Sequence, residues 1–112
     1  MSGGGNGYVG DAGGGGSQTT PCHSIVERAH VSSPDPEVLK SISIGTILDL
    51  EVDTSTTPLL LVKAPDGRTL GSVVPSRMAR IVSCILNEGV QYMAVVLQIN
   101  GGFVQVEIRA KS

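Results

Sequence analysis

The stretch MAVVLQINGGFVQVEI, residues 93–108, decides the fold because it joins two runs of alternating apolar residues through an Asn-Gly pair. Asn-Gly is the preferred pair of a two-residue type I′ turn, which connects antiparallel strands. The register that this turn sets pairs apolar residues on one face: Leu97 with Val104, Val95 with Val106 and Met93 with Ile108. The stretch is therefore predicted to be a β-hairpin with these side chains facing the core.

The other face of the predicted hairpin is unusually apolar for solvent-facing positions, because it carries Tyr92, Ala94, Val96 and Phe103. Contiguous exposed apolar residues often mark an interaction surface. We therefore expect these four residues to bind a partner, either another protein or a second copy of the chain. The alternative is that a strand of the same domain covers them.

The preceding sequence predicts more strands, at HSIVERAHV (23–31), TILDLEVD (46–53) and the hairpin LLLVKAPDGRTLGSVV (59–74). The Pro-Asp-Gly turn of this hairpin opposes Ala64 to Arg68, and hence Val62 to Leu70. In SSPDPEVLKSI (32–42), Asp35 can cap a short helix that starts at Pro36. PSRMARIVSCILNEG (75–89) predicts an amphipathic helix that ends at Gly89. Its apolar face comprises Met78, Ala79, Ile81, Val82, Ile85 and Leu86, with Cys84 at the boundary.

These elements predict a mainly β (β-rich α+β) fold. We expect a small antiparallel OB- or SH3-like barrel of about six strands, with the amphipathic helix between strands four and five. Residues 1–21, MSGGGNGYVGDAGGGGSQTTP, are mostly glycine and small polar residues and are predicted to be a disordered tail. Residues 22–112 are predicted to form the single domain.

Composition restricts the partners of this domain. The net charge of −2 argues against binding that relies on a broad basic surface for duplex DNA. The first residues lack the pattern of a signal peptide, and no apolar stretch approaches the roughly 20 residues that span a bilayer. With only two cysteines, the chain is expected to be a cytoplasmic protein with reduced thiols and no contact with membranes.

The residues that could carry catalysis or bind metal are few and poorly spaced. Cys22, His23, His30 and Cys84 do not match a zinc motif, and Cys84 has no histidine predictably near it. Asp49, Glu51 and Asp53 share one side of a strand, as on a solvated face. The chain is therefore predicted to have no catalytic residues, metal site or cofactor, and not to be an enzyme.

Two arginines near the start of the second helix are candidates for anion binding. Arg77 and Arg80 lie close to the free N–H groups and the positive dipole end of the helix, and Ser76 precedes them. With Arg68 from the neighbouring strand end, they could hold one phosphate or nucleic-acid end. The alternative is that the arginines only keep the outer face of the helix solvated.

The run DGRTLGSVVPSRMARIVSCILNEGVQYMAVV, residues 66–96, resembles the HIRAN domain family, and the resemblance extends over residues 45–96. The residues DTSTTPLLLV (53–62) differ from the polar signature typical of that family. The resemblance implies a small OB- or SH3-like barrel that binds single-stranded DNA ends. Under this resemblance Arg77, Arg80 and Tyr92 would lie near phosphate or base.

Two functions follow from these patterns. The first is a non-catalytic binding module of a small bacterial-type protein, acting as a protein-interaction or adaptor domain through the apolar face of the last hairpin. The second is a HIRAN-like domain that binds single-stranded DNA ends through Arg77 and Arg80. We favour the first of these two functions.

Overall fold

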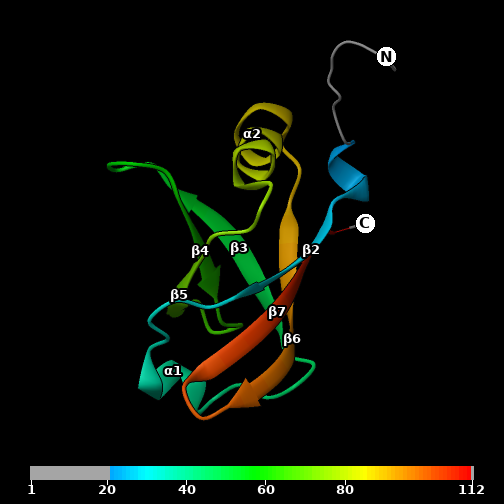
Figure 1. Cartoon of the computed structure of the whole chain (residues 1–112). Coiled ribbons are helices and arrows are strands. Elements are labelled where there is room, and N and C mark those ends of the chain that lie inside the picture. The colour runs from blue at the N-terminus through cyan, green and yellow to red at the C-terminus, as the bar shows by residue number, and fades with distance from the viewer. Residues whose placement is uncertain (1–20, 112) are drawn as a thin grey trace.

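The computed structural model describes residues 21–111, which fold into six strands, one 3-10 turn and two helices (Figure 1). In chain order the elements are η1 (Cys22–Ser24), β2 (Val26–His30), α1 (Pro36–Leu39), β3 (Ile47–Asp53), β4 (Leu59–Lys63), β5 (Thr69–Val73), α2 (Met78–Glu88), β6 (Tyr92–Asn100) and β7 (Phe103–Ala110). The predicted mainly β class is confirmed, as are the number of strands and the position of the longer helix between the fourth and fifth strands.

The strands form one antiparallel sheet in the order β2-β7-β6-β3-β4-β5, and this sheet curls into a half-barrel (Figure 1). The segment after β2 crosses toward β5, where Ser32 and Ser72 form an isolated antiparallel bridge. The Asp35 N–H donates to the Leu70 carbonyl at 2.7 Å and extends this contact. The two edges of the sheet are therefore linked by hydrogen bonds through residues 32–35.

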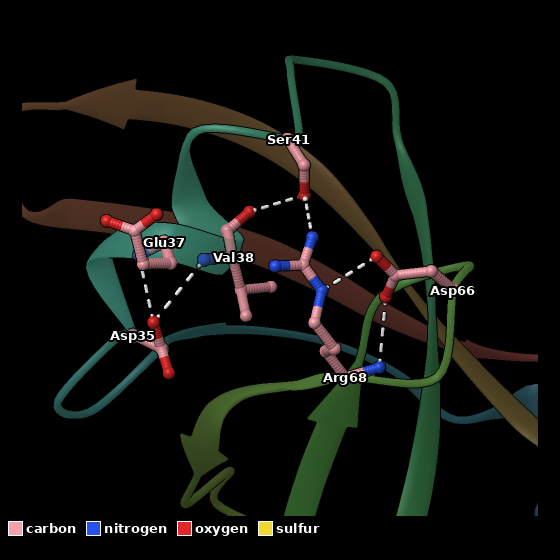
Figure 2. Close-up of polar contacts among 6 residues, drawn as sticks. All are labelled: Asp35, Glu37, Val38, Ser41, Asp66 and Arg68. Atoms are coloured by element: carbon pink, nitrogen blue, oxygen red, sulfur yellow. Dashed lines mark hydrogen bonds and ion pairs between the residues drawn. The ribbon is translucent and has the colours of Figure 1, made fainter.

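The short helix α1 is capped as predicted. The Asp35 carboxylate accepts hydrogen bonds from the N–H groups of Glu37 (2.9 Å) and Val38 (3.4 Å), and Pro36 is the first helical residue (Figure 2). The longer helix α2 ends at Gly89, whose left-handed conformation (φ 67°) is also as predicted. Figure 1 places α1 and α2 at opposite ends of the half-barrel.

The predicted face of β6 is wrong, and a β-bulge is the reason. The loop residues are Gly101 and Gly102, so Asn100 pairs with Phe103, and the register then shifts between Val96 and Gln98. An extra residue in one strand reverses which side chains face inward beyond it. Tyr92, Ala94 and Val96 consequently lie in the core, whereas Met93, Val95 and Leu97 are only half-buried. The inward face predicted for β7 is confirmed, because Val104, Val106 and Ile108 are fully buried.

The buried face of α2 also differs from the predicted one. Cys84, predicted at the boundary, is fully buried with Ile81, whereas Leu86 is 54% exposed and Ala79 is exposed. A disulfide joins Cys84 to Cys22 in η1. This bond turns the Cys84 side of the helix toward the core. Because both cysteines are in the disulfide, the prediction of reduced thiols is wrong.

Candidate functional site

The N-terminus of α2 is already in contact with a carboxylate of the chain. The backbone N–H of Arg77, the N-cap residue, donates to Glu27 of β2 at 3.2 Å, and the Arg77 guanidinium lies 3.5 Å from the same carboxylate. The Glu27 side chain is 10% exposed. Glu27 therefore provides the negative charge that this end of the helix favours. An external phosphate would have to displace Glu27.

The two other predicted arginines also contact carboxylates. Arg80 lies 3.1 Å from Glu88 at the other end of α2. Arg68 lies 2.7 Å from Asp66 and donates to the Ser41 hydroxyl at 3.2 Å (Figure 2). Hydrogen bonds from the Arg68 backbone, and next from its side chain, hold the pKa of Asp66 below its ordinary value.

The structure does not assemble the four predicted phosphate-binding residues. Arg77 is the N-cap of α2, Arg80 lies on its first turn, and the exposed Ser76 precedes Arg77. Arg68 contacts Ser41, which follows α1, and α1 lies at the end of the half-barrel opposite α2 (Figure 1). The expectation that Arg68 joins the others around one phosphate is therefore wrong.

The predicted partner-binding face is mostly part of the core. The exposed fractions of Tyr92, Ala94 and Val96 are 1%, 0% and 1%, so these residues offer no contact surface. Phe103 is 46% exposed, and its ring stacks with that of His30 on the neighbouring strand at 6.2 Å. The alternative that the domain itself covers this face is the one that the structure supports.

Tyr92 links the core to the disulfide. Its hydroxyl donates to the Cys22 carbonyl at 2.7 Å. Burial raises the pKa of the Tyr92 phenol. The charge of Arg80 lowers this pKa and the charge of Glu88 raises it, and both effects are smaller than that of burial. The phenol therefore keeps the proton that this hydrogen bond requires.

The reversed face of β6 places a different set of apolar side chains outside. Ile47 at the start of β3 is 53% exposed and pairs directly with Val95 of β6, and Ile44 just before β3 is 67% exposed. The Gly45 N–H donates to the Val96 carbonyl at 2.8 Å, which holds the Ile44 segment against β6. We define the outer strip as Ile44, Ile47, Met93, Val95 and Leu97.

Charged residues of both signs border the outer strip. Asp49 of β3 binds Lys111, and Glu107 of β7 lies between Arg109 and Arg28. The register places Asp49 opposite Met93 and Glu107 opposite Val95, so these ion pairs flank the apolar side chains on both sides. The outer strip is therefore an apolar centre with a charged rim, the arrangement typical of protein interfaces.

Cavities and buried polar groups offer no further candidate site within residues 21–111. This part of the chain contains no detectable pocket, and all its buried residues are apolar or cysteine except for the hydroxyl of Tyr92. Neither α1 nor α2 has the length and hydropathy that crossing a bilayer requires.

No family model, curated protein or solved structure matches this chain. The HIRAN resemblance and the binding of single-stranded DNA ends therefore stay predictions. The function has to be argued from the side chains themselves.

Proposed function

We propose that this chain is a non-catalytic protein-interaction module, that the outer strip is its contact surface, and that the partner is a second copy of the chain. The observation that carries the proposal is the exposure of Ile47 directly opposite the half-buried Val95, with the exposed Ile44 three residues earlier in the chain. Isolated exposed apolar residues are common on proteins and need no explanation. Adjacent ones across two paired strands form a continuous patch, which favours an interface.

The position of the strip in the sheet indicates the kind of contact. β3 and β6 are the two central strands, and each is hydrogen-bonded on both sides. Their backbones cannot accept an added strand, so a partner must dock face to face on side chains. Two sheets that pack in this way bury the apolar residues between them.

The rim favours a second copy of the same chain. A two-fold interface has to be self-complementary, because each patch meets an identical patch. The rim carries acidic residues (Asp49 and Glu107) and basic ones (Arg109, Arg28 and Lys111) in about equal measure. A two-fold rotation can therefore bring opposite charges together around an apolar centre.

The test is sedimentation equilibrium of the full chain over a wide concentration range. We expect reversible dimerisation that Ile47→Asp weakens by about tenfold or more, because a central interface side chain contributes at least about 1.4 kcal/mol. Val74→Asp is the matched control, since Val74 is 70% exposed but precedes α2 and lies outside the strip. A wild-type chain that stays monomeric into the high micromolar range, or equal losses in both variants, would contradict the proposal.

The competing role in DNA-end binding has its own measurement. We expect the fluorescence anisotropy of a labelled single-stranded oligonucleotide to stay unchanged at low salt when the protein is added. The physical reason is that Glu27 and Glu88 already neutralise Arg77 and Arg80. Binding that weakens with salt and is lost in the Arg77→Ala, Arg80→Ala double variant would instead favour the HIRAN-like role.

A further inference from the structure

We propose that reduction of the Cys22–Cys84 disulfide creates a zinc site whose protein ligands are the two cysteine thiolates and the Glu88 carboxylate. In the oxidised chain, the two sulfur atoms and a Glu88 oxygen all lie within 4.8 Å of one another. Thiolates together with a carboxylate are ligands that Zn²⁺ accepts in tetrahedral sites. The three residues come from η1 and the second half of α2.

The two cysteine backbones are held in place by contacts that do not require the disulfide. The Cys22 carbonyl accepts a hydrogen bond from the buried Tyr92 hydroxyl at 2.7 Å. The Cys84 carbonyl accepts one from Val90 N–H at 3.1 Å, where the chain leaves α2. Because these anchors are independent of the S–S bond, we expect the two thiols to stay close together after reduction.

The spacing suits a shared metal ion. The Cα atoms of Cys22 and Cys84 are 5.9 Å apart. Two sulfurs bound to one tetrahedral zinc at about 2.3 Å lie roughly 3.8 Å from each other. Rotation of the two side chains can open the S–S pair to this distance without moving the backbone.

Burial gives the site a closed side and an open side. Cys84 is fully buried and Cys22 is 6% exposed, whereas Glu88 is exposed. Zn²⁺ and a water molecule as fourth ligand can enter from the Glu88 side. Glu88 also binds Arg80 at 3.1 Å, and a carboxylate can use one oxygen for the metal and the other for the guanidinium.

A dithiol reductant attacks the Cys22–Cys84 bond, is itself oxidised to a disulfide, and leaves a proton on each of the two protein thiols. Zn²⁺ then replaces these two protons, which pass to solvent, as two Zn–S bonds form. Since binding releases protons, the apparent zinc affinity is expected to rise with pH through the range in which thiols ionise.

The test uses the full chain, reduced with a dithiol that is removed without oxygen, and Co²⁺ as a spectroscopic substitute for Zn²⁺. We expect one Co²⁺ per chain to produce thiolate-to-cobalt charge-transfer absorption, and one equivalent of Zn²⁺ to abolish it. The oxidised chain and the Cys22→Ser, Cys84→Ser variant should show no such absorption. Its absence from the reduced wild-type chain would overturn the proposal.

A matched pair of variants tests the third ligand. Glu88→Gln is expected to weaken Co²⁺ binding by about tenfold or more, the loss usual for a removed or disturbed ligand. Glu37→Gln should leave it unchanged, because Glu37 is an exposed, ion-paired glutamate on α1. Equal affinities in both variants would exclude Glu88 as a ligand. If reduction alone melts the sheet, Zn²⁺ should restore its circular dichroism, and failure to do so would also overturn the proposal.

Discussion

Removing the Cys22–Cys84 disulfide is expected to lower the free energy of unfolding by about 4 kcal/mol. The bond joins residues separated by 62 positions, and closing a loop of that length restricts the unfolded chain strongly. A small domain has only about 5–15 kcal/mol of stability in total. The loss is therefore a large fraction of the stability of this domain.

Chemical denaturation of the oxidised and reduced chains, both with a metal chelator present, measures this difference directly. The Cys22→Ala, Cys84→Ala variant is the control, because its midpoint should not respond to reductant. The free energy of unfolding of this variant should be close to that of the reduced chain, and lower only by the contribution of the two buried sulfur atoms that it lacks. Equal midpoints for the oxidised and reduced wild-type chains would show that the two cysteines are not bonded in solution.

Gly71→Ala is expected to lower the free energy of unfolding by about 3 kcal/mol, because Gly71 lies where the chain crosses from β2 to β5. A Cβ at this position would lie 2.6 Å from the Ser32 carbonyl oxygen and 2.6 Å from a Val31 methyl group. The Ser32 oxygen belongs to the backbone of the Ser32–Ser72 bridge, so it cannot move without breaking the contact between the sheet edges. Overpacking against a fixed backbone carries a penalty of this size.

Gly102→Ala is the matched control for Gly71→Ala. Gly102 lies in the turn between β6 and β7, and a Cβ there would have nothing within 4 Å. We expect this change to alter the free energy of unfolding by less than about 0.5 kcal/mol. Thermal or denaturant unfolding of the two variants gives the comparison, and similar values for both would contradict the close approach at Gly71.

Local signals in the sequence predicted most of the elements. Asp35 with Pro36 marked the start of α1, and Gly89 marked the end of α2. The turn that joins Ala64 to Arg68 was also predicted: the Ala64 N–H donates to the Arg68 carbonyl at 2.8 Å, and Gly67 is left-handed (φ 91°). Each of these features depends on residues within a few positions of one another, so a single sequence carries them.

The β-bulges in the β4–β5 and β6–β7 pairs could not be predicted from these local sequence signals. A bulge after Val62 pairs that residue with Gly71 in place of the predicted Leu70, although Val62 and Leu70 both remain buried. The bulge at Leu97 had a larger effect, because it reversed the faces of β6. Apolar residues occupy both faces of β6, so the pattern itself gave no sign of the reversal.

The candidate site depended on contacts between distant residues. Glu27 and Arg77 are 50 positions apart, and Cys22 and Cys84 are 62 apart, so neither pair is visible as a motif. One residue of the outer strip, Ile47, could be recognised as unusual from the sequence alone. Ile47 interrupts the polar side of its strand, which otherwise carries Asp49, Glu51 and Asp53.

The disulfide also bears on where the protein works. Cytoplasmic localisation stays a prediction, but a buried disulfide is uncommon in a reducing compartment. If the chain does meet reductant in such a compartment, the proposed zinc site would link η1 and α2 through metal–ligand bonds in place of the disulfide.

The most direct test of the central claim is a dilution series followed by two-dimensional amide NMR of the full chain. If the outer strip binds a second copy, the amide signals of residues 44–47 and 93–97 should move with concentration, together with those of the rim at Glu107 and Arg109. Signals of α1 and of the turn after β4 should stay fixed. Concentration-dependent shifts elsewhere, or none at all, would contradict the account.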